Sequence, residues 1–290
     1  GRADYIPIFI SETPNLFLNG IIPLDIALVQ VSPPDKHGFC SLGTSIDCTR
    51  AALQTSNLVI GQINSYVPRT HGDGIIHYTN FDYAVYRDEP LYTGEKVFLN
   101  PADIAIGNLI AQYLVADGAT LQFGVGSIPS AVLQHLNSHK NLGIHSEMLT
   151  DGIMPLIEHG IVTNSEKNLD KGKIVSSILL GSRELYDFAN DNPIVDMRDI
   201  SYTNDPYVIK QQKKMTAING AIEVDLAGQV CSDSIGENIY SGVGGQVDFL
   251  RGAALAPEGK PIIALPSRTE SGINRIVSYI SEGAGVVTSR

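Results

Sequence analysis

The sequence predicts an α/β protein with open, mostly parallel sheets, divided into two lobes. Apolar runs of strand length alternate with amphipathic segments of helix length along most of the chain, which is typical of parallel sheets with helices on their faces. The chain has 290 residues, more than one typical domain, so two lobes are expected. Two glycine-rich turns also precede expected helices, and the first of them directly follows an expected strand, where parallel sheets bind ligands.

The first part of the chain predicts two strands with polar loops after them. The run Leu24–Val31 is apolar enough for a strand buried on both faces, and Asn57–Asn64 predicts the next strand. Ser41–Gln54 predicts a helix between them. The loops Ser32–Gly43 and Pro68–Gly74 are rich in proline, glycine and polar residues. Each leaves a strand at its carboxyl end, which is the expected ligand-binding edge.

Two histidines stand in these loops, His37 and His71. They are candidates for contact with a substrate. Hydrogen bonding of each histidine within its own loop is the simpler alternative and stays open. No further cluster of ligands accompanies them, so the sequence predicts no metal site.

A polar stretch over Tyr83–Asn100 lacks a strand pattern and predicts a domain boundary. We therefore expect a first lobe over residues 1–96 and a second over 97–290. Pro101–Asp117 predicts a helix, because its apolar residues recur on one helical face. Pro101 suits the first helical position, and Gly118 suits the stop.

The first glycine-rich turn, Gly124–Gly126, follows an expected strand over 119–123 and precedes a helix opened by Pro129. Glycines allow close approach of a ligand, and free amides at a helix start favour an anion. A plain tight turn is an equally good interpretation. The sequence lacks the third glycine of the dinucleotide fingerprint and the lysine of the P-loop, which disfavours those nucleotide sites.

Glu147 follows the short apolar run Leu142–Ile144, which predicts a strand end. A carboxylate there is a candidate functional residue, although a solvated glutamate is the commoner case. The α/β alternation then continues. The expected helices are Asp151–His159, Arg183–Asn190 and Asp205–Gln212, and the expected strands are Lys173–Leu180, Pro193–Met197, Met215–Asn219 and Lys260–Leu265.

The second glycine-rich turn contains Gly242, Gly244 and Gly245 and directly precedes a helical stretch. Amides at a helix start have no helical partner and can bind an oxyanion. A tight turn that needs positive φ is the alternative. Arg268 follows the last expected strand and is a candidate anion contact, with an ordinary surface arginine as the alternative.

Composition excludes several classes of function. The net charge is -11, which disfavours nucleic-acid binding, and no apolar run approaches the ~18 residues of a membrane span. The three cysteines, Cys40, Cys48 and Cys231, show no metal-like spacing. With no signal-peptide pattern at the start, they predict reduced thiols in a cytoplasmic protein. The chain does not open on Met, so we expect a piece of a longer protein.

Five motifs in series carry a family resemblance. The segments SPPDKHG, PRTHGD, DGATLQFGVGSIPSAVL, LGIHSEMLTDG and YSGVGGQVDF, in this order, resemble the acetyl-CoA hydrolase/transferase family over nearly all of the chain. The resemblance implies two open α/β lobes that face each other across a cleft, usually in a homodimer. It also implies that both lobes are incomplete here, at the start of the first and at the end of the second.

The resemblance further implies roles for the candidate residues. Glu147 matches the family's nucleophile, which carries CoA as a glutamyl thioester. The first glycine-rich turn would lie against CoA. The second would supply amides to the thioester oxygen and also contact CoA, and Arg268 would contact CoA. Cys231 is a departure, because relatives often have Asn there. The turn residues are Gly124, Val125, Gly126, Ser127 and Ile128 in the first turn, and Gly242, Gly244 and Gly245 within Gly242–Phe249 in the second.

The implied activity is transfer of CoA between an acyl-CoA (acetyl-, butyryl- or 4-hydroxybutyryl-CoA) and a carboxylic acid such as acetate. CoA is then a substrate, and no tightly bound cofactor is expected. Hydrolysis of acetyl-CoA by the same glutamate stays open. More remote alternatives are a sugar-phosphate isomerase or deaminase and a non-catalytic CoA-binding protein.

Overall fold

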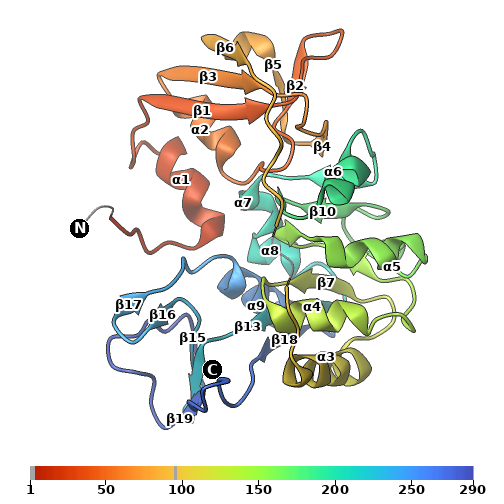
Figure 1. The fold of residues 1–290 in the computed structure, drawn as a ribbon, viewed down its shortest axis with the longest axis vertical. Coiled ribbons are helices and arrows are strands. Elements are labelled where there is room, and N and C mark those ends of the chain that lie inside the picture. Colours follow the sequence, from red (N-terminus) through yellow and green to blue (C-terminus); the bar gives the residue numbers. More distant parts are fainter. Residues whose placement is uncertain (1–3, 95–96, 290) are drawn as a thin grey trace.

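The computed structural model describes residues 4–94 and 97–289 and is an α/β fold with mostly parallel sheets (Figure 1). The first sheet has the order β1-β3-β6, and all its strands are parallel. Its strands are β1 (Ile26–Val31), β3 (Leu58–Ile63) and β6 (Tyr83–Tyr86).

Two expectations for this sheet are wrong. β1 is not buried on both faces, because its residues alternate and Leu28 is 76% exposed. The stretch expected to lack strand structure opens with β6, which pairs with β3. All four residues of β6 are exposed, so this edge strand shows no alternation of apolar and polar residues in its sequence.

The helix expected over Ser41–Gln54 is shorter and begins later. α2 covers Thr49–Thr55, and the chain before it forms β2 (Phe39–Ser41) and a loop. Gly43 and Asp47 both have positive φ in this loop, which is incompatible with a continuous right-handed helix. β2 pairs with β5 (Ile75–His77) in an antiparallel ladder.

The central sheet has the order β18-β13-β7-β8, and every pair in it is parallel. These strands confirm the alternation expected from the sequence. Their bounds are Lys260–Ala264 for β18, Met215–Gly220 for β13, Thr120–Phe123 for β7 and Gly143–Ile144 for β8.

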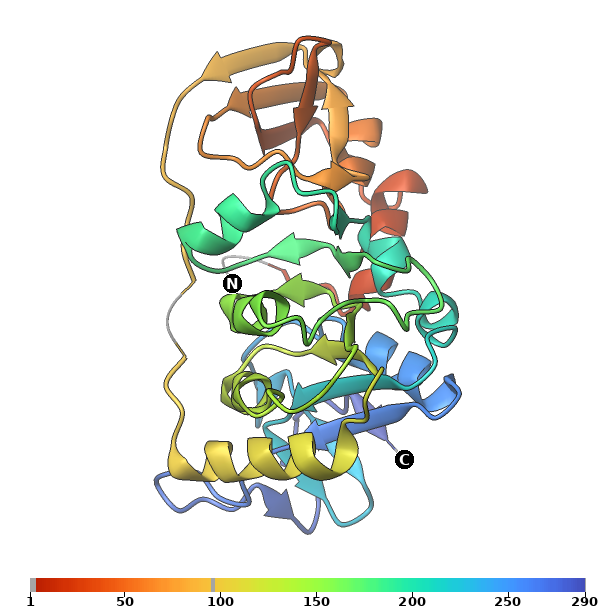
Figure 2. The same ribbon diagram turned by 90° about the vertical axis from the view of Figure 1, so that its right-hand side faces the viewer.

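Helices lie on both sides of the stacked parallel strands (Figure 2). α3 (Pro101–Leu114), α4 (Ser127–Gln134), α5 (Met154–Glu158) and α6 (Arg183–Ala189) lie on one side. α7 (Ile200–Thr203), α8 (Pro206–Ile209) and α9 (Gln246–Leu255) lie on the other. α1 (Thr13–Leu18) packs near α2, and short 3-10 turns cover Ile10–Glu12, Tyr78–Asn80 and Asp151–Ile153.

The strand expected over Lys173–Leu180 is divided in two, β10 (Ile174–Ser176) and β11 (Ile178–Leu179). β11 pairs with β9 (Met148–Leu149), and β10 pairs with β12 (Val195–Met197). β4 (His71–Gly72) joins the other edge of β12. A strand from the first part of the chain therefore completes a sheet of the second part. The boundary predicted after residue 96 lies at residues 95–96, outside the described residues.

The sequence did not predict a small, largely antiparallel region near the end of the chain. One sheet there has the order β19-β14-β15-β20, and a two-stranded ladder joins β16 and β17. The strands are β14 (Glu223–Asp225), β15 (Gln229–Cys231), β16 (Ser234–Ile235), β17 (Asn238–Ile239), β19 (Ile276–Val277) and β20 (Thr288–Ser289). They are two or three residues long, which is too short to show the alternation of apolar and polar residues that identifies a strand in a sequence.

One apolar core runs from the first sheet to the central sheet. It includes Val31 and Ile63 from the first part and Leu121 and Ile218 from the second. A smaller cluster lies between α8, α9 and β13. Across the described residues, every helix is too short or too polar to cross a membrane.

Candidate active site

The main chain at Glu147 is fixed by the strands beside it. Glu147 lies between β8 and β9, and its carbonyl oxygen accepts hydrogen bonds from the main-chain N–H groups of Ser177 and Ile178, each at 3.0 Å. The Ser176 hydroxyl donates to the same oxygen at 3.1 Å. Three donors to one carbonyl hold the segment rigidly at the sheet edge.

The Glu147 side chain is held by two groups from other parts of the chain. Asn204 Nδ2 donates to Glu147 Oε2 at 2.7 Å, and the Gly245 main-chain N–H also bonds the carboxyl group. A Cβ atom on residue 245 would overlap Glu147 Oε2 and Asn204 Nδ2. Glycine is therefore the residue that permits this close approach of the turn to the carboxylate.

Burial raises the pKa of Glu147 above its usual value, and the charge of Asp47 acts in the same direction. The hydrogen bonds from Asn204 and Gly245 oppose this shift. A poorly solvated carboxylate held by two donors is positioned to attack a carbonyl carbon, because little water has to be removed from it first.

Glu147 lines a cavity of about 1230 Å³. The structure brings the two glycine turns together on this cavity, although more than 100 residues separate them in sequence. Arg268 lines it as well. The lining includes the predicted residues Gly124, Val125, Gly126, Ser127, Ile128, Gly242, Gly244 and Gly245.

Three helix N-termini meet at the cavity. The starts of α3, α4 and α9 contribute Asp103, Ser127 and Gln246 to its lining. The N-terminus of a helix carries partial positive charge and unpaired N–H groups. Arg268 and Arg275 add two guanidinium groups. These helix starts and guanidinium groups give the cavity places for negative charge on a ligand, beside the carboxylates of Asp103, Glu147 and Glu270 that also line it.

Sequence reasoning missed three residues of the site. Asn204 lies directly before the helix expected over Asp205–Gln212, and no local pattern indicates that it reaches a glutamate 57 residues away. Arg275 lies in a polar loop, and nothing in the sequence distinguishes it from an ordinary surface arginine. The third, His145, lies two residues before Glu147, and the sequence alone indicates no function for it.

His145 connects the Glu147 segment to Asn204. Its ring is fully buried, and Nε2 donates to the carbonyl oxygen of Thr203 at 2.8 Å. Burial lowers the pKa of His145 to about 4, so the ring is neutral at physiological pH and one ring nitrogen is a donor. This bond fixes the residue directly before Asn204.

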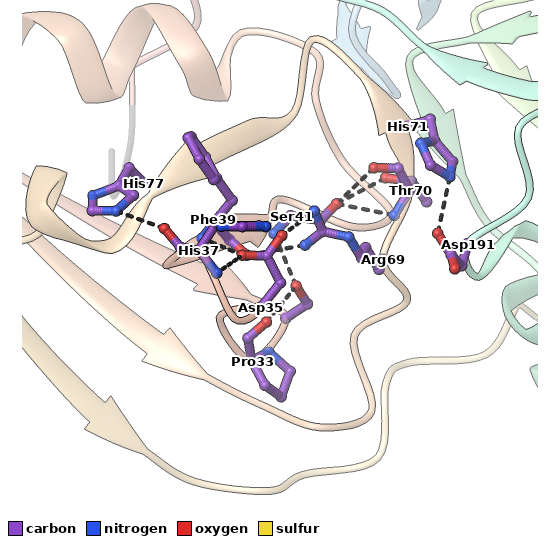
Figure 3. A network of polar contacts seen from close by, with 11 residues as sticks. Pro33, Asp35, His37, Phe39, Ser41, Arg69, Thr70, His71, His77 and Asp191 are labelled. Atoms are coloured by element: carbon purple, nitrogen blue, oxygen red, sulfur yellow. Dashed lines mark hydrogen bonds and ion pairs between the residues drawn. The ribbon is translucent and has the colours of Figure 1, made fainter.

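The two loop histidines have partners of their own (Figure 3). His71 Nε2 lies 3.1 Å from Asp191 Oδ1. The main-chain N–H of His37 donates to Asp35 Oδ1 at 2.8 Å, and the His37 carbonyl contacts His77 Nε2 at 3.1 Å. Among the described residues that line the cavity, neither His37 nor His71 is present.

Arg69 joins the two loops that carry these histidines (Figure 3). Its guanidinium donates to Asp35 Oδ2 and to the Phe39 carbonyl, both at 2.9 Å. The main-chain hydrogen bond from Phe39 has the largest effect and lowers the pKa of Asp35; burial opposes it, and the bond from His37 and the charge of Arg69 lower the pKa further. The loops are thus fastened to each other. Residues 4–94 and 97–289 contain no group of His, Cys, Asp and Glu suited to a metal ion.

Curated proteins similar to this chain include CoA-transferases and an acetyl-CoA hydrolase. The chain is 50% identical to 4-hydroxybutyrate coenzyme A transferase from Clostridium kluyveri, over 100% of this chain and 68% of that protein. Residues 1–93 match the acetyl-CoA hydrolase/transferase N-terminal domain, and residues 181–290 match the acetyl-CoA hydrolase/transferase C-terminal domain. The chain belongs to the acetyl-CoA hydrolase/transferase family.

Two further curated proteins are similar over all or most of the chain. The succinyl-CoA:acetate/propanoyl-CoA:succinate CoA transferase of Fasciola hepatica is 51% identical over 100% of this chain and 61% of that protein. An acetyl-CoA hydrolase of Candida albicans is 32% identical over 89% of this chain and 56% of that protein.

Solved structures agree with the fold. RipA from Yersinia pestis superposes with a TM-score of 0.94 at 36% identity, over 99% of this chain and 65% of that one. The 4-hydroxybutyrate CoA-transferase from Porphyromonas gingivalis gives a TM-score of 0.85 at 41% identity, over 94% of this chain and 67% of that one. The chain spans about two thirds of the length of these relatives.

Proposed function

We propose that the protein is a CoA-transferase that moves CoA between an acyl-CoA and a small carboxylate through a glutamyl-CoA thioester on Glu147. The observation that carries this proposal is the Glu147 carboxylate itself. It is largely buried, held by Asn204 and Gly245, and exposed to a cavity of about 1230 Å³ built for an anion.

The chemistry uses Glu147 as nucleophile. Its carboxylate attacks the acyl-CoA carbonyl, the C–S bond breaks, and a mixed anhydride and CoA thiolate form. The thiolate then attacks the glutamyl carbonyl, and the acyl group leaves as a carboxylate. A second carboxylate reverses these steps. Each addition develops an oxyanion, and one well-placed amide donor stabilises such a charge by about 3 kcal/mol. The amides of Gly244 and Gly245 and the side chain of Asn204 are the proposed donors.

We assign the CoA site to the rest of the cavity. Gly124, Val125, Gly126, Ser127, Ile128 and Gly242 would lie against CoA, with Arg268 and Arg275 near its phosphates. The three helix N-termini support this assignment, because CoA is a substrate with several negative charges. We propose no other cofactor. The contacts of His37 and His71 within the loop region favour positioning of those loops over direct contact with the acceptor.

The complete protein would have two open α/β lobes facing across a cleft. In this proposal residues 1–96 belong to the first lobe and residues 97–290 to the second, and neither lobe is complete in this chain. A homodimer and a cytoplasmic location are part of the same proposal. The free thiols of Cys40, Cys48 and Cys231 agree with a reducing compartment.

Trapping of the thioester tests the proposal. After incubation with acyl-CoA and reduction with borohydride, peptide mass mapping should find Glu147 converted to its alcohol. Glu147→Gln should abolish exchange of CoA between acyl-CoA and labelled acetate. As a control, Glu158→Gln changes an exposed glutamate at the end of α5 and should keep wild-type exchange. Labelling of another acidic residue would refute the assignment of Glu147.

Hydrolysis of acetyl-CoA is the second candidate, favoured by the similarity to the hydrolase of Candida albicans. The two activities share the thioester and differ in what attacks it next. Water is present at ~55 M, so a transferase has to exclude water and position its acceptor. We expect transfer to dominate when acetate is present, and Glu147→Asp to shift the balance toward slow hydrolysis.

Release of free CoA, measured with and without acetate, separates these activities. Equal release in both conditions without exchange would identify a hydrolase. Neither release nor exchange, with CoA binding retained, would identify a binding protein. A sugar-phosphate isomerase or deaminase would give no Glu147 thioester.

A further inference from the structure

A second buried carboxyl group lies beside the candidate nucleophile. Asp248 is 4% exposed and stands in the first turn of α9, three residues after Gly245. An acid at this helix position often bonds the N–H groups at the helix start. Asp248 instead accepts from Ser11, whose hydroxyl donates to Oδ1 at 2.9 Å and whose main-chain N–H donates to Oδ2 at 3.4 Å.

The side chain of Asn204 stands between the two carboxyl groups. Its Nδ2 donates to Glu147 and lies against Gly245, at the start of the helix whose first turn carries Asp248. From there Asn204 also favours the charged form of Asp248. An amide nitrogen carries two hydrogens, so the bond to Glu147 leaves one N–H free to face Asp248. The Asn204 oxygen, Oδ1, is buried and has no partner among the described residues. The contacts of Nδ2, and not those of Oδ1, therefore fix the orientation of the Asn204 amide.

A turn of this amide by 180° would change the site. It would place Asn204 Oδ1 against the Glu147 carboxylate and remove the donor from Glu147. After the turn, Asn204 Oδ1 would face the carboxylates of both Glu147 and Asp248. Repulsion from two carboxylates opposes the turn more strongly than repulsion from one. A neutral asparagine at position 248 would present its own N–H groups and would no longer oppose it.

We propose that Asp248 is a positioning residue of this site: as a carboxylate it keeps the Asn204 N–H groups directed at Glu147, and Ser11 holds Asp248 in place. This inference rests on the proposed function. The main-chain N–H of Ile10 also contacts the carbonyl of Gly244, at 3.4 Å, so the segment before α1 supports the turn as well. Burial raises the pKa of Asp248 to about 6, which leaves the group ionised at neutral pH.

Kinetics of Asp248→Asn test the inference. In the full chain we expect kcat for acyl-CoA:acetate exchange and the single-turnover rate of thioester formation to fall at least about tenfold, with KM for acyl-CoA within about twofold. Asp225→Asn is the matched control, because Asp225 is also 4% exposed and accepts main-chain hydrogen bonds at 2.9 Å, but from Ala227 and Gln229 of its own turn and not from residues of the site. It should keep the wild-type kcat.

A double-variant cycle separates positioning from a structural role. If Asp248 acts through Asn204, Asp248→Asn should cause no further loss of kcat in an Asn204→Ala background. Additive losses would overturn the inference, as would a raised KM at unchanged kcat. Should Asp248→Asn not fold, Ser11→Ala decides: we expect about threefold lower kcat at unchanged KM, and a wild-type kcat would overturn the inference.

The outcomes also separate this inference from the proposed function. A wild-type protein without exchange and without a thioester on Glu147 would overturn both. An active wild-type protein with an unaffected Asp248→Asn variant would overturn this inference alone.

Discussion

At the scale of single residues, the site depends on how close Gly245 approaches Glu147. The glycine has no side chain to keep its N–H from the carboxyl oxygen, and the overlap of an added Cβ would involve both Glu147 and Asn204. The other glycines of this turn differ, since the positions of Gly242 and Gly244 have open space around them. The turn is thus constrained most strongly at the one residue that touches the carboxylate.

We expect Gly245→Ala to lower kcat by at least about 100-fold, because a methyl group there displaces the carboxylate from its donors, and loss of one oxyanion donor has an effect of this size. Exchange kinetics of the purified variant measure it. Gly94→Ala is the control, because a Cβ atom at position 94 would meet Leu180 at an ordinary 3.5 Å and the residue lies away from the cavity. A Gly245→Ala enzyme with wild-type kcat would show that the close approach has no catalytic role.

The pH dependence of activity follows from the two buried carboxyl groups. Glu147 attacks as a carboxylate, and burial raises its pKa above 4.5, so protonation removes the nucleophile at a higher pH than in an exposed glutamate. Asp248, with a pKa raised to about 6, loses its charge in the same direction. We expect kcat/KM to fall as pH drops from 7 to 5, measured by initial rates of exchange. Rates that stay constant down to pH 4.5 would contradict the raised pKa values.

At the scale of elements, the position of the cavity depends on the contact between α3 and α4. A Cβ atom on Gly107 of α3 would lie 2.7 Å from Ala131 Cβ and 2.8 Å from the Ala131 carbonyl carbon in α4. The two helices therefore pack more closely than a side chain at position 107 would allow. Both present their N-termini to the cavity, so their spacing affects the expected CoA site.

Gly107→Ala should destabilise the protein by about 1–3 kcal/mol and raise KM for CoA, because overpacking outweighs the better helix propensity of alanine. Urea unfolding gives the first quantity and initial rates give the second. Gly160→Ala provides a comparison. The position has open space, but its positive φ is unfavourable for alanine, so this variant should lose stability while KM stays unchanged. A stabilised Gly107→Ala variant would show that the helices adjust at little cost.

At the scale of the whole molecule, the two predicted lobes are joined by more than the segment between them. β4 pairs with β12, Ile46 donates to the carbonyl of Ser177 at 2.9 Å, and Leu179 donates to that of Thr44 at 2.8 Å. Residues 87–94 and 97–100 also run along the side of the molecule between β6 and α3 (Figure 2). Ile46, Ser177 and Leu179 are all buried at these bonds, so unfolding of one part would expose the core of the other.

We therefore expect this chain to unfold in one cooperative transition. Calorimetry and denaturant titration followed by far-UV and near-UV circular dichroism should give coincident midpoints. Two resolved transitions, with residues 4–94 losing structure first in hydrogen exchange, would show instead that the predicted boundary separates independent folding units.

The sequence by itself determined the features that depend on neighbouring residues. The apolar runs at β7, β13 and β18 and the helical spacing after Pro101 predicted parallel strands and helices, because each pattern repeats within a few residues. Glu147 and the glycine turns were also found from local signals. Each of these features, whether a buried strand, a turn with free amides or a carboxylate at a strand end, has a recognisable pattern within a short segment of sequence.

The tertiary structure alone decided which distant residues meet. Asn204 lies 57 residues from Glu147, and Ser11 lies 237 residues from Asp248. β6 and the short antiparallel strands lacked a period, because they are exposed or only two to four residues long. Strand order in a parallel sheet is set by crossovers and core packing rather than by sequence neighbours. The partners that orient the Glu147 carboxylate became visible only when the sheet edges and α9 had been placed.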